Sequence, residues 1–128
     1  FHASESDTCN RLLNAIEPDS YIQPHCHHAA TKDETLIVVR GRIGVVFFDA
    51  RGGVSAKALL TPMGEAAGVN IPHGVYHTLV ALDPGSVFFE AKAGPYAPLT
   101  SREKAPWAPA EGDPTASSYL AELKRLFV

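Results

Sequence analysis

The amino-acid sequence predicts an all-β sandwich or barrel, and two observations support this fold class. About seven or eight short runs rich in Val, Ile, Leu and Phe follow one another, separated by Gly, Pro, Asp and Ser turn signals. These runs do not alternate with helical segments, as they would in a parallel α/β sheet. The 128-residue chain is 45% apolar and 20% charged, which is typical of one folded globular domain.

The strands are expected at regular intervals, each ended by its own turn. Pro18, Asp19 and Ser20 end the first strand, and Gly41 predicts a tight hairpin between two apolar runs. A further turn at residues 83–86 precedes the last strand. The expected strands, within a barrel of about residues 10–93, cover residues 11–17, 21–27, 34–40, 42–49, 54–60, 69–71, 75–82 and 87–92.

The chain changes character after the last strand. Residues 94–114 hold five prolines and predict an irregular tail, in which Trp107 is expected to lie flat on the barrel. Residues 116–127 predict a short C-terminal helix, because their apolar side chains recur at helical spacing and residues 115–118 can cap the first turn. We expect this helix to pack on its own barrel, with a homodimer contact as the alternative.

Composition excludes several classes of function. A net charge of −3 offers no basic surface for nucleic acid, and no apolar run approaches the roughly 20 residues that cross a membrane. Two cysteines do not make a disulfide framework, so we expect a cytoplasmic location, with Cys26 as a small buried apolar residue. Because the chain starts at Phe1 without a methionine, we expect upstream residues to be missing.

Two histidines in the second expected strand point to metal binding. His25 and His27 are two residues apart, so on an extended strand both imidazoles face one side and Cys26 faces the other. Glu34 begins the next strand, and His77 follows the sharp turn at residues 72–74. Three imidazoles and one carboxylate suit a divalent transition metal, and Fe, Mn, Ni, Co and Zn all accept such ligands. Neutral imidazoles are needed, so metal occupancy is expected to fall below about pH 6.

These residues also carry a family resemblance. His25-x-His27 with Glu34 and Gly41 resembles the first sequence motif of the cupin superfamily, and Pro72-x-Gly74-x-x-His77 resembles the second. Stretches at residues 11–18, 35–42, 89–96 and 105–109 resemble WbuC-type cupin metalloproteins, so that the likeness covers roughly residues 10–112.

The resemblance implies a single cupin domain over residues 1–128, a double-stranded β-helix or jelly roll with one divalent metal in its mouth. The implied metal ligands are His25, His27, Glu34 and His77. WbuC-type proteins are often encoded among surface-polysaccharide genes, which implies a small sugar-like ligand.

The chain departs from the cupin motifs at two places. Six residues separate His27 from Glu34, more than is usual. His28 is therefore an alternative to His27, and Asp33 an alternative to Glu34, although Glu34 has the expected spacing from Gly41. In the second motif, Ala81 stands where an Asn is usual.

Other polar residues are candidates for the ligand cavity. Tyr21 and Gln23 share the expected strand face of His25 and His27, which makes them substrate-pocket candidates. Glu90 and Lys92 share a face of the last strand, and Tyr96 follows shortly after it. We take these last three as candidate catalytic residues. The Glu90 and Lys92 pair could orient a polyhydroxy or anionic substrate, or could be an ordinary salt bridge at the rim.

These features predict a metal site without naming a reaction. One hypothesis is a metal-dependent isomerase, epimerase or oxygenase that acts on a small sugar-like molecule. The alternative is a non-catalytic metal-binding or ligand-binding cupin, such as a sensor, because no clear general base stands beside the ligands. Metal-free sugar epimerisation with a histidine base would not need the full ligand set, which disfavours it.

Overall fold

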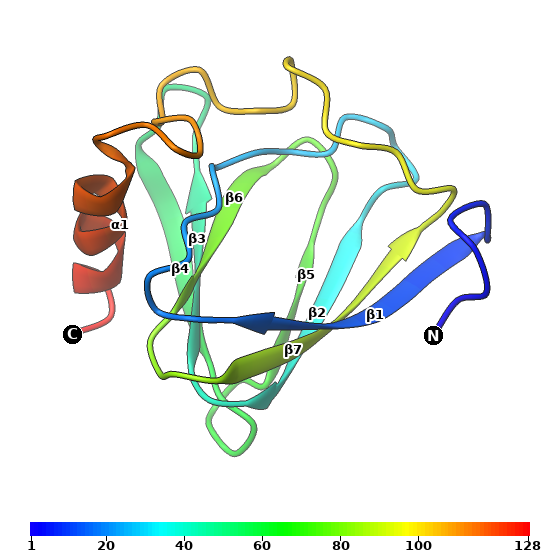
Figure 1. Cartoon of the computed structure of the whole chain (residues 1–128), viewed down its shortest axis with the longest axis horizontal. Helices are drawn as coiled ribbons and strands as arrows, with labels where there is room; N and C mark the ends of the chain where they lie inside the picture. Colours follow the sequence, from blue (N-terminus) through cyan, green and yellow to red (C-terminus); the bar gives the residue numbers. More distant parts are fainter.

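The computed structural model describes residues 1–128 and confirms the all-β jelly roll. A four-stranded sheet has the order β1 (Cys9–Ile16), β7 (Ser86–Ala93), β2 (Glu34–Arg40) and β5 (Gly68–Ile71). A three-stranded sheet has the order β4 (Val54–Leu60), β3 (Ile43–Phe48) and β6 (Tyr76–Ala81). All pairings are antiparallel, and the two sheets open from one another like the sides of a wedge (Figure 1).

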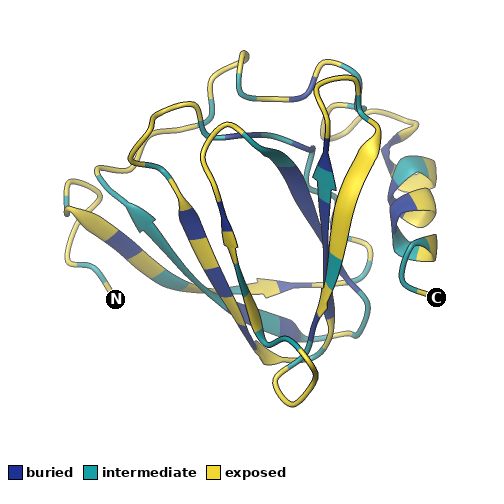
Figure 2. Ribbon diagram, turned by 180° about the vertical axis from the view of Figure 1, so that it is seen from behind, coloured by how far each residue is buried: buried dark blue, intermediate teal, exposed yellow.

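The apolar core lies between the two sheets, because alternate residues of the strands point inward. Along β2, Glu34, Leu36 and Val38 are buried while Thr35 and Ile37 are exposed. Strand β4, by contrast, is an almost wholly exposed edge (Figure 2). The core draws on both sheets and contains Ile16, Leu36, Val38, Ile43, Val45, Leu60, Ile71, Leu79, Ala81 and Phe88. Glu34 is the charged member of the inward row of β2, so its carboxylate stands at the end of the apolar core.

The tight hairpin predicted at Gly41 is wrong. Strand β2 pairs with β5 and β7, whereas β3 pairs with β4 and β6, so the chain crosses from one sheet to the other at this glycine. Gly41 has a φ of 80°, and a Cβ added there would stand 2.3 Å from Ser86 Oγ. A glycine is required by both the left-handed backbone and the close approach of β7.

The strand predicted over residues 21–27 is also wrong. The segment forms only isolated bridges, from His25 to His77 on one side and to Lys104 on the other. The His25 and His77 backbones exchange N–H···O bonds of 3.1 and 2.9 Å, and Gly74 N–H donates to the His27 carbonyl at 2.7 Å. Pro24 cannot donate a ladder bond. The segment is therefore held to the start of β6 by a few bonds, without a continuous ladder.

The part of the Pro-rich tail around Trp107 and the C-terminal helix cover the outer face of the three-stranded sheet. Trp107 lies over Gly52, where an added Cβ would stand 2.6 Å from the indole ring, and its ring centroid is 4.9 Å from that of Phe48. Helix α1 (Ala116–Arg125) buries Leu120 and Leu123 in a second cluster with Val46, Phe48 and Val80. As expected, the helix packs on its own barrel, beside the three-stranded sheet (Figure 1). No helix in the structure is long and apolar enough to pass through a membrane.

Candidate metal centre and ligand cavity

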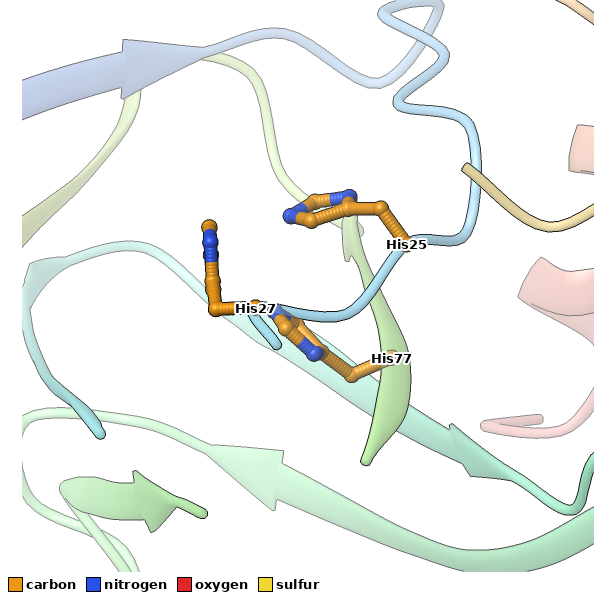
Figure 3. A group of neighbouring side chains, drawn as sticks. All are labelled: His25, His27 and His77. Carbon is orange, nitrogen blue, oxygen red and sulfur yellow. The ribbon is translucent and has the colours of Figure 1, made fainter. Parts of the chain in front are cut away.

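Three histidines meet at one end of the barrel. His25 and His27 come from the irregular segment before β2, and His77 is the second residue of β6. One ring nitrogen of each lies within 4.8 Å of the others, and Figure 3 shows the three rings turned toward a common point. The backbone bridge between His25 and His77, which are 52 residues apart in sequence, brings the three rings together.

Backbone carbonyls fix the orientation of two of these rings. His25 Nδ1 lies 2.9 Å from the Gln23 carbonyl, and His77 Nδ1 lies 2.9 Å from the Val75 carbonyl. A carbonyl can only accept, so each Nδ1 carries the proton and each Nε2 keeps its lone pair. This is the usual support of a metal-ligating histidine, whose second ring nitrogen donates to a backbone oxygen.

Glu34 completes the group from the neighbouring sheet. Its Oε2 lies 3.2 Å from His27 Nε2 and 3.4 Å from His77 Nε2, and the residue is 5% exposed. Both Glu34 Oε2 and His27 Nε2 are buried without a hydrogen bond of good geometry. Unpaired buried polar atoms are costly. A divalent cation among these lone pairs would satisfy them, so the residues present fit a metal.

The pKa shifts of His25 and Glu34 favour the protonation states that bind a cation. The pKa of His25 is lowered to about 4, mainly by burial and then by the neighbouring His77 imidazole. Burial alone would raise the pKa of Glu34, but contacts with His27, His77 and Glu90 outweigh it and hold that pKa well below its usual range. His25 is thus neutral to well below the pH of about 6 expected for an ordinary histidine, and Glu34 is ionised.

The structure separates the two alternative ligands from this group. His28 is exposed, and its backbone N–H donates to Glu103 Oε2 at 3.0 Å. Asp33 Oδ1 accepts from the His73 backbone N–H at 2.9 Å and lies 2.8 Å from His73 Nδ1, on the protein surface. The longer loop therefore ends in a surface contact, and His27 and Glu34 remain as the inward residues.

A cavity of about 380 Å³ opens beside the histidines. All three candidate catalytic residues, Glu90, Lys92 and Tyr96, line it, together with His25, His27, Glu34 and His77. The strand register explains this, because Lys92 pairs with Glu34 and Glu90 pairs with Leu36, so both point inward. No ion pair joins Glu90 and Lys92, so the rim salt bridge considered from the sequence does not form.

The two substrate-pocket candidates on the histidine segment do not line this cavity. Tyr21 donates its hydroxyl to the Pro109 carbonyl at 2.8 Å and packs with Tyr119, and Gln23 Nε2 donates to the Ala105 carbonyl at 3.1 Å. Both side chains bind the tail. Their predicted placement assumed strand alternation, which this irregular segment does not have.

Glu90 stands out among the residues of the cavity. Its pKa is raised to about 8, first by burial and then by the neighbouring Glu34 carboxylate, while Lys92 and Asn14 act in the opposite direction. Two carboxyl groups in contact repel each other when both are ionised. Glu34 and Glu90 therefore share one proton, and Glu90 carries it.

Several other residues of the cavity carry no local sequence signal. Asn14, from β1, and Ala97 and Leu99, from the tail, also form its wall. Asn14 lies opposite Phe88 in the pairing of β1 with β7, a long-range register that no local pattern reveals. Cys26 behaves as predicted, being 1% exposed and outside the cavity.

Comparisons with known proteins give one family-model match and several structures of similar fold. A family model described as a domain of unknown function (DUF6016) matches residues 1–60. A comparison with curated proteins found no match. Among solved structures, KdgF from Halomonas sp. aligns with a TM-score of 0.55 and 22% identity, over 70% of this chain and 72% of KdgF.

Oxalate decarboxylases are similar over one part of their length. The Lactobacillus farciminis enzyme, solved as a formate complex, aligns with a TM-score of 0.55 and 22% identity over 73% of this chain. A mutant of the Bacillus subtilis enzyme aligns with a TM-score of 0.56 and 22% identity over 72% of this chain. This chain spans only 26% and 23% of those two proteins. These likenesses show the cupin fold.

Proposed function

We propose that this chain binds one divalent transition metal through His25, His27, Glu34 and His77, and that the metal serves a reaction in the adjoining cavity. The observation that supports this most directly is that two buried atoms, His27 Nε2 and Glu34 Oε2, lack a hydrogen bond of good geometry and lie 3.2 Å apart beside the His77 ring. A stability role alone would not require an open cavity of about 380 Å³ beside the ligands.

The reaction we propose is an isomerisation, epimerisation or oxygenation of a small sugar-like molecule, linked to surface-polysaccharide metabolism as in the WbuC-type resemblance. A metal at this site would polarise a carbonyl or hydroxyl, or lower the pKa of a bound water. Glu90 holds a proton within the same cavity, which suits a group that gives or takes one during such a reaction. Lys92 and Tyr96 line the wall on which a substrate would lie. The cytoplasmic location and the homodimer remain predictions.

Metal content tests the first part of the proposal. Purified protein incubated with Mn²⁺, Co²⁺ or Zn²⁺ and then desalted should hold one metal per chain by elemental analysis, and His77→Ala and His25→Ala should hold little. His73→Ala is the matched control, because His73 is exposed and contacts Asp33 outside the cluster. Equal metal content in the wild type, His77→Ala and His25→Ala would contradict the assignment.

Turnover tests the second part. Metal-loaded protein should convert a member of a panel of sugars and sugar nucleotides, and Glu90→Gln should slow that conversion at least tenfold while retaining the metal. A protein that holds the metal and binds a ligand, but converts no member of the panel, would instead be the non-catalytic binding protein considered from the sequence.

A further inference from the structure

A second cavity of about 230 Å³ adjoins the first and is not lined by His25, His27 or His77. Glu90, Lys92 and Tyr96 line both cavities, so these three side chains form the wall between them. The second cavity is completed by Asn10 and Leu12 of β1 and by His2 and Glu5 of the N-terminal segment. None of these four residues belongs to the proposed metal site.

Lys92 is the only lysine or arginine that lines either cavity. Its side chain is half-buried, and its ammonium has neither a hydrogen bond nor an ion pair, although Glu34 lies opposite it on β2 and Glu90 lies two residues away. The other half-buried lysines, Lys32 and Lys124, donate to backbone carbonyls. A half-buried cation without a partner is poised to receive an anionic group.

Asn10 lines the second cavity and carries a buried acceptor atom. It is 4% exposed, and its Oδ1 is buried without a partner. Asn10 pairs with Lys92 across β1 and β7, and residues directly opposite in such a pair have their Cβ atoms about 4.5–5.5 Å apart. An amide oxygen accepts hydrogen bonds, so a ligand hydroxyl would satisfy it.

We propose that the two cavities form one elongated binding site for a polyhydroxylated ligand with an anionic group, in which the anion pairs with Lys92 and a hydroxyl donates to Asn10 Oδ1. The placement of one end of the ligand at the histidines depends on the proposed metal site. The placement of its anionic end depends only on Lys92 and Asn10. The combined volume suits a molecule larger than a two-carbon acid, within the usual range for small-molecule sites.

Three linear six-carbon probes test the anion-binding end: neutral sorbitol, gluconate with a carboxylate, and sorbitol 6-phosphate with a phosphate. Binding is measured by NMR titration at pH 7.5 on Zn²⁺-loaded protein and on metal-free protein. We expect at least one charged probe to bind about tenfold or more tightly than sorbitol to the wild type, with a preference that weakens as salt is added. Which charged probe is preferred distinguishes a carboxylate from a phosphate ligand.

Variants locate that preference. Lys92→Met should reduce the charged-to-neutral ratio to less than about twofold, Lys92→Arg should keep most of it, and Asn10→Leu should weaken all three probes. Lys104→Met is the control, because Lys104 is exposed and lines neither cavity. The NMR spectrum and the Zn²⁺ affinity of each variant report whether its fold is intact.

The outcomes separate the two proposals. If the wild type binds no metal, the proposed function fails, while the titrations on metal-free protein still decide the role of Lys92. If the wild type binds metal but holds all three probes with equal affinity, or if Lys92→Met keeps the preference, the elongated anion-binding site is overturned.

Discussion

At the scale of single residues, Gly41 shows how one position sets the geometry between the two sheets. Its φ of 80° and the Ser86 Oγ atom 2.3 Å from an added Cβ impose two separate penalties on any larger residue. Gly112 shares only the first penalty, because its φ is 85° but nothing lies within 4 Å of its added Cβ. The two glycines therefore separate backbone strain from steric overlap.

We expect Gly112→Ala to lower the free energy of unfolding by about 1 kcal/mol, the cost of a left-handed alanine. Gly41→Ala should cost a further 1–3 kcal/mol or so, because β7 must move away from the new methyl group. Urea unfolding of the metal-free proteins measures both changes. Equal losses in the two variants would mean that Ser86 shifts freely and that the close approach of β7 is not what requires a glycine.

The same scale shows what the sequence could reveal about the site. The spacing of His25, His27, Glu34 and His77 led to the prediction that the four side chains meet. In the structure the three histidines cluster, and Glu34 Oε2 lies 3.2 Å from His27 Nε2 and 3.4 Å from His77 Nε2. Their role as metal ligands stays a prediction until metal is measured. Tyr21 and Gln23 were misplaced because the rule that residues two apart share a face holds only on a regular strand.

At the scale of elements, the histidine segment is positioned by the tail as much as by the barrel. The Cys26 N–H donates to the Glu103 carbonyl at 2.8 Å, and Ala105 N–H donates to the Pro24 carbonyl at 2.8 Å. The Glu103 carboxylate accepts from the backbone N–H groups of Thr100 and His28, both at 3.0 Å. These hydrogen bonds lower the pKa of Glu103 to about 2. The sequence could not show the contact between Glu103 and His28, since 75 residues separate them.

Glu103→Gln should therefore loosen the segment that carries His25 and His27. A carboxamide offers one acceptor oxygen where the carboxylate offers two, so one of the two backbone N–H bonds is lost. We expect the metal dissociation constant to rise by about threefold to tenfold, less than the 10–100-fold typical of a group that touches a ligand directly. Competition with a chromophoric chelator measures this change. Glu122→Gln, at an exposed position of α1, is the control. A metal affinity of Glu103→Gln within twofold of the wild type would contradict the role of the tail.

The connection between β2 and β3 illustrates the limit of local patterns at this scale. Two apolar runs joined by one glycine are typical of a hairpin. In a two-sheet fold the same pattern also fits a crossing, and the choice depends on which strands pair, which here are β2 with β7 and β3 with β6. The existence of the strands was predictable from their alternation, whereas their partners depended on contacts between distant parts of the chain.

At the scale of the whole molecule, the cavity residues should leave a signature in the pH dependence of stability. Without metal, the His25 pKa is lowered from 6.5 to about 4, so below pH 6.5 the unfolded chain takes up a proton that the folded protein refuses. This group alone makes stability fall as the pH drops from 6.5 to about 4, by roughly 3 kcal/mol in total. Glu90 acts in the opposite direction, because its pKa is raised from 4.5 to about 8 and the folded protein keeps a proton that the unfolded chain has lost.

The two effects predict a distinct profile for the metal-free protein. Between pH 4.5 and 6.5 the slopes from His25 and Glu90 cancel, so stability should be nearly flat. Between pH 6.5 and 8 only Glu90 acts, and stability should fall by up to about 1.4 kcal/mol per pH unit. Glu90→Gln carries no titrating proton, so its stability should instead rise from pH 4.5 to 6.5 and stay level to pH 8. Urea unfolding in EDTA at pH 5, 6.5, 7.25 and 8 measures both profiles. A wild type that gains stability between pH 6.5 and 8, or a Glu90→Gln variant with the same falling slope, would show that Glu90 does not hold the shared proton in the folded cavity.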